Sequence, residues 1–251
     1  MKTPPTLKLA CLLCALLLPG AGQAQFDYTT NNGTITFTGY TGAGGAVTIP
    51  AKINGLPVTG IGEGAFAVHA NWKGTAHNKS KGRLTSVTIP DSVTNIGSHA
   101  FTGCSSLTRV TIPTGVTSIG WGMFSGCRGL ANIKIPNSIT SIEFEAFTGC
   151  SGLTDIAIPD SVTNIGDWAF SACTSLRAIT VDARNPIYGS VDGVLFDKNH
   201  ATLIQFPSGK TGGYAIPNGV TGVGQWAFSK CDNLTSVIIP DRNLCKSILN
   251  N

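Results

Sequence analysis

The sequence predicts a β-rich repeat solenoid, and two observations lead to this prediction. One stretch, LTRVTIPTGVTSIGWGMFSGC at residues 107–127, recurs with small changes at 84–104, 130–150 and 153–173, so that each copy begins 23 residues after the last. A fixed period of about 20 to 50 residues is typical of a solenoid, in which each unit buries its apolar side against its neighbours. The composition agrees, because Val, Ile, Thr and Phe recur and 31 glycines suit short strands and tight turns.

Each copy carries its own signals for a strand and a turn. Leu107, Val110 and Ile112 should face inward from a short strand, and Pro113 ends that strand because it lacks a backbone N–H. We therefore expect a stack of 23-residue coils with a wall of parallel strands. The aromatic residue of the following Ala-Phe pair should fill the centre of each coil, which predicts a stacked spine of Phe101, Phe124, Phe147, Phe170 and Phe228.

Residues 1–24 have the features of a signal peptide. Lys2 and Lys8 flank its start, a ten-residue apolar run follows, and small residues precede the expected cleavage site. This run is too short to cross a bilayer, which needs about 20 apolar residues, so we expect no membrane span in the mature chain. The sequence thus predicts a protein that is secreted or held at the cell surface. Lipid attachment at Cys11 or Cys14 is the less favoured alternative.

The rest of the chain divides into a cap, a solenoid and a tail. The cap is expected at 25–46, the solenoid at 47–240 and the tail at 241–251. Asn32-Gly33 marks a hairpin in the cap, which would cover the open edge of the first coil. Asp192-Gly193 marks a second hairpin, inserted within the stack. The solenoid itself comprises an irregular unit at 47–83, regular repeats at 84–175, an elaborated unit at 176–233 and a last strand at 234–240.

Six cysteines follow the leader, at positions 104, 127, 150, 173, 231 and 245. The first four share one repeat position, so their Cβ atoms should point the same way, whereas a disulfide needs two Cβ atoms facing each other about 3.8 Å apart. We therefore expect buried free thiols at these four positions. Cys245 lies off the repeat, which leaves a bridge between Cys231 and Cys245 open.

Charge and motifs exclude several classes of function. The formal charge of +4 falls to +2 once Lys2 and Lys8 are removed, and Lys and Arg form no cluster, so no nucleic-acid partner is expected. The cysteine and histidine spacings match no zinc or metalloprotease pattern, and no GxSxG motif occurs. We expect no metal, no cofactor, no catalysis and a monomeric chain.

The motif LxxVxIPxxVTxIGxxAFxxC covers most of residues 47–240 and resembles the BspA-like leucine-rich repeats of bacterial and protist surface antigens. The segment NPIYGSVDGVLFDKNHATLIQFP also resembles an insert that recurs in that family. The resemblance implies a leucine-rich-repeat stack, surface or extracellular placement, and a role in adhesion or host-protein binding. It supplies no substrate and no catalytic residue.

Two sets of side chains are candidates for binding. Residues between the inward aliphatics should point out from the strand wall, and solenoid walls commonly serve as binding platforms. The predicted binding face consists of Arg109, Thr111, Asn132, Lys134 and Asp155. Tryptophans beside the Ala-Phe pair could stack on a sugar or anchor a protein, and these are Trp121, Trp168 and Trp226. The alternative for both sets is a role in solubility or in shielding the coil.

These observations favour a secreted or cell-surface protein that binds an extracellular protein or glycan without catalysis. A structural piece of a larger envelope array, with no discrete ligand, is the alternative. A carbohydrate-active enzyme is less favoured, because it would need two facing carboxylates and no local motif marks such a pair.

Overall fold

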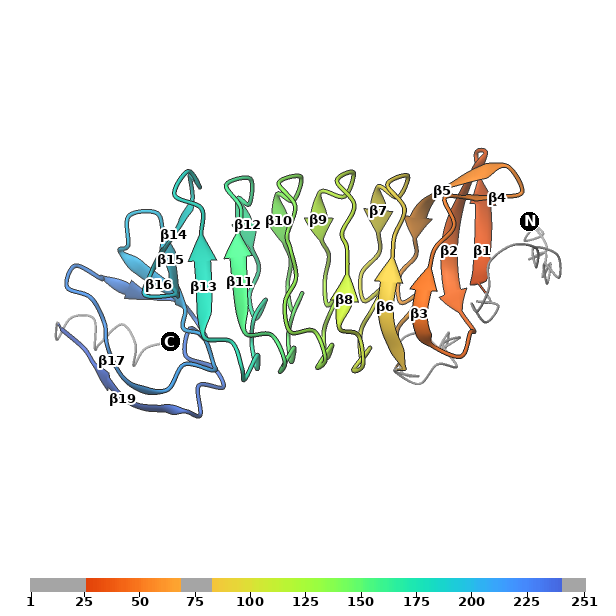
Figure 1. Cartoon of the computed structure of the whole chain (residues 1–251). Helices are drawn as coiled ribbons and strands as arrows, with labels where there is room; N and C mark the ends of the chain where they lie inside the picture. The colour runs from red at the N-terminus through yellow and green to blue at the C-terminus, as the bar shows by residue number, and fades with distance from the viewer. Residues whose placement is uncertain (1–25, 69–82, 241–251) are drawn as a thin grey trace, which may run out of the picture.

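The computed structural model describes residues 26–68 and 83–240. They form an elongated stack of about eight coils, about 23 residues apart, and no described residue is helical (Figure 1). The predicted β-rich solenoid is therefore confirmed. Consequently, no helix in the described ranges could cross a membrane. The predicted signal peptide, the C-terminal tail and Cys245 lie outside these ranges.

The first wall of the stack consists of the LxxVxIP strands. β6 pairs in parallel with β3 and β8, and β11 pairs in parallel with β13. The strand expected in the copy that begins at Leu130 is absent, so this wall is interrupted between β8 and β11. Leu107, Val110 and Ile112 are all buried, as predicted for inward positions. The strands of this wall are β3 (Gly45–Thr48), β6 (Leu84–Thr88), β8 (Arg109–Val110), β11 (Asp155–Ile158) and β13 (Ala178–Val181).

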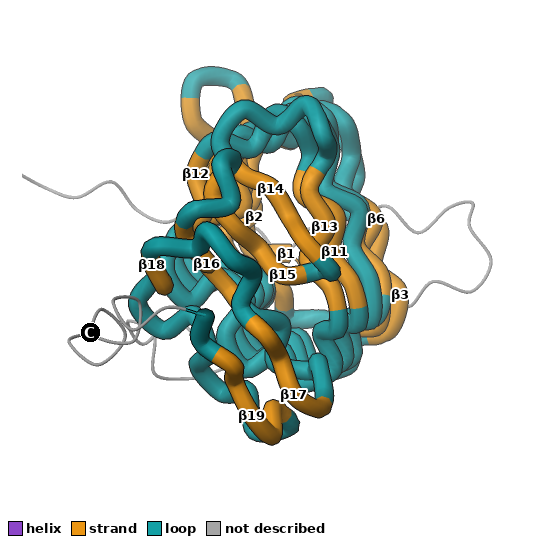
Figure 2. Tube along the Cα trace, turned by 90° about the vertical axis from the view of Figure 1, so that its left-hand side faces the viewer, coloured by secondary structure: helices purple, strands orange, loops and turns teal. Residues whose placement is uncertain are grey.

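A second parallel wall, which the sequence did not predict, lies on the opposite side of each coil (Figure 2). β5 pairs in parallel with β2 and β7, and β10 pairs in parallel with β9 and β12. β7 and β9 are not paired, so the wall is interrupted between them. Its strands are β2 (Thr34–Tyr40), β5 (Leu56–Ile61), β7 (Asn95–Ile96), β9 (Ser118–Ile119), β10 (Ser141–Ile142) and β12 (Asn164–Ile165).

Turns that contain the Ala-Phe pair close each coil. Backbone N–H groups of one turn donate to carbonyl oxygens of the next turn, so the stack is held here by hydrogen bonds without strands. These hydrogen bonds, of 2.8–2.9 Å, include those from the N–H of Phe101 to Met123, of Phe124 to Ala146 and of Phe147 to Ala169. We call the two residues before each Ala-Phe pair, or its equivalent, the corner residues.

Hairpins occur at both places that the sequence indicated. β1 (Phe26–Asn31) pairs antiparallel with β2 through Asn32-Gly33, and both turn residues have positive φ. The insert pairs β14 (Tyr188–Val191) with β15 (Val194–Asp197), and β15 continues antiparallel to β16 (Thr202–Gln205). The remaining strands are β4 (Lys52–Ile53), which pairs antiparallel with β5, β18 (Gly222–Val223), which is parallel to β16, and the parallel pair β17 (Gly212–Ala215) and β19 (Leu234–Ile238).

Asn185 anchors the insert to the coil before it. This side chain is fully buried, and its Nδ2 donates to the carbonyl oxygens of Pro159 and Val162, each at 2.8 Å. Its Oδ1 accepts from the N–H groups of Ile187 and Tyr188 at 2.9 and 2.8 Å. One amide thus hydrogen-bonds to four backbone groups, of which the Pro159 carbonyl oxygen also accepts the Val162 N–H at 3.4 Å.

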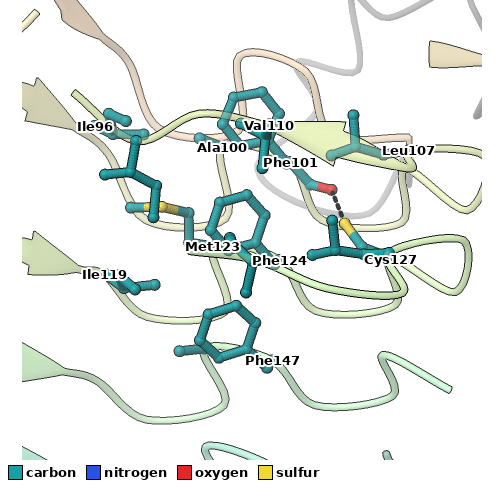
Figure 3. Packing of buried hydrophobic residues seen from close by; sticks show 14 of the residues in the cluster. Ile96, Ala100, Phe101, Leu107, Val110, Ile119, Met123, Phe124, Cys127 and Phe147 are labelled. Atoms are coloured by element: carbon teal, nitrogen blue, oxygen red, sulfur yellow. Dashed lines mark hydrogen bonds between the residues drawn. The ribbon is translucent and has the colours of Figure 1, made fainter. Parts of the chain in front are cut away.

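A stack of phenylalanine rings runs through the centre of the coils (Figure 3). The rings are nearly parallel, with interplanar angles of 7–14° and centroids 5.2–5.7 Å apart along Phe66, Phe101, Phe124, Phe147 and Phe170. The predicted place of Phe228 in this spine is wrong. It packs at 5.3 Å against Phe206 in a second hydrophobic cluster, because the elaborated unit separates the last coil from the main core.

The four regular cysteines are buried free thiols, as predicted. Each Sγ donates to the carbonyl oxygen of the spine phenylalanine of the preceding coil, at 3.1–3.2 Å. The thiols therefore form a ladder beside the aromatic spine. Its members are Cys104, Cys127, Cys150 and Cys173.

Candidate binding sites

The five residues of the predicted binding face are all exposed, on the side of the stack that carries the first wall. Arg109 and Asp155 belong to β8 and β11, whereas Asn132 and Lys134 lie between them in a segment that forms no strand. Arg109 and Asn132 line one shallow hollow of about 350 Å³, together with Thr85, Ser86 and Thr108. Asp155 does not line it. The ion pairs among the described residues join Arg184 to Asp160 and Asp182, so Arg109 and Asp155 do not neutralise each other. Thr111 and Lys134 are exposed outside the hollow.

The three predicted tryptophans belong to one continuous row of aromatic side chains. Trp121 contacts Phe144 at 5.8 Å between ring centroids, Phe144 contacts Trp168 at 5.6 Å, and Trp168 contacts Trp226 at 5.7 Å. These four residues, which we call the aromatic row, are 44%, 38%, 37% and 51% exposed in that order. The structure thus brings the tryptophans together and adds Phe144 between two of them.

A shortened turn explains why Trp226 reaches Trp168, although 58 positions separate them. Leu203 pairs with Val223, and the N–H of Phe206 donates to the carbonyl oxygen of Ala227. Only two residues lie between Leu203 and Phe206, whereas a regular coil has four at this place. The elaborated unit therefore lacks a pair of corner residues, and Trp226 from the next coil packs against Trp168.

Carboxylates accompany the aromatic row. Glu63, Glu145 and Asp167 are corner residues, and no corner residue of the described coils is Lys or Arg. His99 is also a corner residue, with its ring 5.3 Å from that of Trp121. Burial lowers the pKa of the His99 imidazole, and the nearby Glu63 and Glu145 carboxylates only partly oppose this effect. This edge of the stack is therefore acidic as well as aromatic.

A polar groove lies in the second wall, at the interruption between β7 and β9. Its volume is about 220 Å³, and it is lined by residues 94–98 and 116–118 with Gly120 and Glu143. Glu143 accepts hydrogen bonds from the Ser118 hydroxyl at 2.7 Å and from the Trp121 backbone N–H at 3.2 Å. The groove therefore adjoins the backbone that begins the aromatic row. We call it the coil groove.

A family model described as the BspA type leucine rich repeat region matches six copies in residues 75–190 and 206–251. The chain belongs to this family. No curated protein sequence matches it. The BspA-type assignment agrees with the repeat and the solenoid described above.

Solved structures of other leucine-rich repeat proteins are similar to most of the chain. A leucine rich cell surface protein from Faecalibacterium prausnitzii A2-165 is 34% identical, with a TM-score of 0.53, and the match covers 88% of this chain and 71% of that one. A Leucine Rich Repeat protein of T. pallidum is 27% identical, with a TM-score of 0.57 over 90% and 92%. The pneumococcal vaccine antigen PcpA is 24% identical, with a TM-score of 0.64 over 88% and 64%, and shares the fold.

Among these neighbours, the Faecalibacterium prausnitzii protein is described as a cell surface protein, and no catalytic family is indicated. In the described parts of the chain, no group of three His, Cys, Asp or Glu side chains could hold a metal ion. The exposed features that remain are suited to binding: the hollow at Arg109, the aromatic row and the coil groove.

Sequence reasoning missed three residues of these sites. Phe144 holds the corner position that Trp121 holds in the preceding copy, but it is not among the predicted contacts. Glu143 replaces the glycine found at positions 97, 120, 166 and 224, and Met123 replaces the alanine of the Ala-Phe pair. Both departures from the BspA-type repeat were visible signals, because such positions otherwise have one small residue in every regular copy.

Proposed function

We propose that the protein is a secreted or surface-displayed binding protein of the adhesion type, and that the aromatic row is its contact surface for an extracellular protein. Membership of a family of bacterial surface proteins supports this placement. The single observation that carries the proposal is the row itself, in which four large aromatic side chains from different coils are exposed and in mutual contact.

The exposed part of such a row keeps apolar surface in contact with water until a partner covers it. Scattered exposed hydrophobic residues are ordinary, but a contiguous apolar strip rimmed by polar groups marks interaction sites. Tryptophan is also enriched among the interface residues that contribute most to affinity. The repeat could place a small or polar residue at each corner, as it does with Ser98, so the aromatic side chains are not required for the coil to form.

The chemistry of the row favours a protein partner with basic residues. The ring planes of Trp121 and Phe144, and of Trp168 and Trp226, are tilted by 85° and 80°, so the row is no single flat platform for stacked sugars. Irregular protein side chains fit such a surface. Glu63, Glu145 and Asp167 complement Lys and Arg, which can also pack on aromatic faces.

The test is a binding screen of the purified protein against extracellular-matrix proteins, with glycans as a second panel. For a partner found in the screen, the double change Trp168→Ala and Trp226→Ala should weaken affinity at least about tenfold. Ile187→Ala is a matched control, because Ile187 is as exposed as Trp121 but lies outside the row. Equal losses in both variants, unchanged affinity in the double variant, or binding to glycans alone would overturn the proposal.

A further inference from the structure

The junction between the coils of β7 and β9 lacks hydrogen bonds that other junctions have. In the second wall, the N–H of Thr94 donates to Thr59, that of Thr140 to Thr117 and that of Thr163 to Thr140, at 2.8–3.0 Å. The equivalent bond from Thr117 to Thr94 is absent. Three residues after these threonines, the backbone N–H groups of Gly97, Glu143 and Gly166 each donate to a carbonyl oxygen of the preceding coil. The N–H of Gly120 makes no such bond to Ile96. These two junction bonds are missing where the coil groove lies.

The neighbouring coils are also farther apart at this junction. A Cβ atom placed on Gly97 would lie 2.5 Å from the backbone nitrogen of Glu63, and one on Gly166 would lie 2.5 Å from that of Phe144. At Gly120 the nearest atoms would be 3.8 Å away. Close approach to the preceding coil thus requires glycine at positions 97 and 166 but not at position 120. The extra space forms the groove.

Met123 accounts for this space. It is fully buried and takes the place of the alanine in the Ala-Phe pair, and Figure 3 shows its side chain between Ile96 and Ile119. Because protein interiors are close-packed, a longer side chain at this point must displace its neighbours. The displacement occurs in the second wall, where only two-residue strands hold adjacent coils together, and leaves the aromatic spine stacked.

Glu143 supplies the second feature of the groove. Its carboxylate is turned back toward the preceding coil and is fixed by Ser118 and by the Trp121 N–H. A carboxylate has about four acceptor positions, so it can accept further hydrogen bonds from a ligand. Met123 and Glu143, two departures from the repeat on consecutive coils, therefore both shape the coil groove.

From this geometry we propose that the coil groove binds one ring of a neutral or amino sugar at the end of a glycan. Its lining offers the hydroxyls of Thr94, Ser98 and Thr117, the amide of Asn95 and the Glu143 carboxylate. It also offers the backbone N–H groups of Thr117 and Gly120, which make no hydrogen bond to the preceding coil. Such donors and acceptors match a polyhydroxylated ring. The volume is below the roughly 300–1,000 Å³ of sites for drug-sized ligands, which limits the ligand to about one ring.

Charge separates the sugar classes. Glu143 is the only charged side chain of the lining, and neither Lys nor Arg is present to pair with an anion. Sialic and uronic acids should therefore be disfavoured, because their carboxylates would face Glu143 without compensation. An ammonium group on an amino sugar would instead pair with Glu143. The proposal does not depend on the aromatic row as a protein interface.

The test titrates the purified protein with neutral, amino and acidic monosaccharides and short oligosaccharides, followed by NMR or calorimetry. Glu143→Gln keeps the size of the side chain but removes its charge, and should weaken binding by about tenfold or more. Met123→Ala should have a similar effect because the groove closes. Glu145→Gln and Met123→Leu are the matched controls and should bind within about threefold of the wild type.

Three results would overturn the sugar site: no neutral or amino sugar binds, acidic sugars bind best, or Glu143→Gln leaves affinity unchanged. Should Met123→Ala unfold, Glu143→Gln still decides. The variant with Trp168→Ala and Trp226→Ala should retain sugar binding. Failure of the protein interface and failure of the sugar site are thereby measured separately.

Discussion

Cys127 donates its thiol hydrogen to the backbone carbonyl oxygen of Phe101, with 3.2 Å between the heavy atoms (Figure 3). The same oxygen accepts a hydrogen bond from the backbone N–H of Cys104 at 3.1 Å, so the thiol bonds to the second lone pair of the carbonyl oxygen. Equivalent contacts repeat along the ladder. The coils are therefore joined beside the aromatic spine by neutral thiols, and this has consequences for reactivity, pH dependence and stability.

We predict that the ladder thiols resist alkylation in the folded protein. Burial raises the pKa of Cys104 and Cys173 to about 12 and raises that of Cys127 and Cys150 well above the ordinary value of 9.0. Because the thiolate is the reactive form, labelling at pH 8 should be slow in buffer. Denaturation without reductant should expose at least four thiols. Recovery of none would contradict a ladder of free cysteines.

The same raised pKa values predict that the free energy of unfolding falls at alkaline pH. Above about pH 9 the unfolded chain releases thiol protons that the folded chain keeps, so stability decreases as pH rises from about 9 toward 12. Urea unfolding at several pH values in this window measures the slope. A variant with Cys127→Ala and Cys150→Ala should show a shallower slope, and an equal slope would assign the effect to other groups.

Truncation of a central ring should destabilise the stack strongly. Phe124 is fully buried between Phe101 and Phe147, with both ring centroids 5.5 Å away. Phe124→Ala should lower the free energy of unfolding by about 3–5 kcal/mol. Phe144→Ala, in the exposed row, should cost less than about 1 kcal/mol. Chemical denaturation of both variants measures the contrast, and similar costs would mean that the spine does not dominate the core.

Much of the fold could be predicted because the repeat presents the same physical problem in every copy. Leu107, Val110 and Ile112 had to face inward, and their burial follows from the strand period and the proline that ends it. The second wall was missed because a two-residue strand such as Ser118–Ile119 differs from a turn only through its partner in the next coil. Local sequence does not contain that information.

The candidate sites were predictable only in part, because they depend on contacts between coils. Trp168 and Trp226 were each identified from the corner pattern, but their contact requires the shortened turn at residues 203–206. The coil groove needs Met123 and Glu143 together, and each looks like an isolated substitution in its own copy. The effect of a departure from the repeat can be predicted only when its contacts in the neighbouring coils are known.

The insert should depend on the Asn185 amide. Asn185→Ala would leave two carbonyl oxygens and two N–H groups without this partner, and unsatisfied buried groups cost about 1–3 kcal/mol each. We expect a loss of at least about 3 kcal/mol in the free energy of unfolding. Asn164→Ala is the control, since that exposed side chain makes one hydrogen bond, to Ser141. A cost below about 1 kcal/mol for Asn185→Ala would contradict an anchoring role.

The hollow at Arg109 and Asn132 allows a test of which face of the stack binds. Both side chains are exposed on the side of the stack that carries the first wall, away from the turns that carry the aromatic row. Arg109→Ala with Asn132→Ala should therefore change stability by less than about 0.5 kcal/mol, as is usual for surface positions. If the row is the protein interface, affinity for the partner should stay within about twofold. A loss of tenfold or more, with the row variant still binding, would instead assign recognition to the first wall, where the Arg109 guanidinium has no ion pair among the described residues and can meet a carboxylate of the partner.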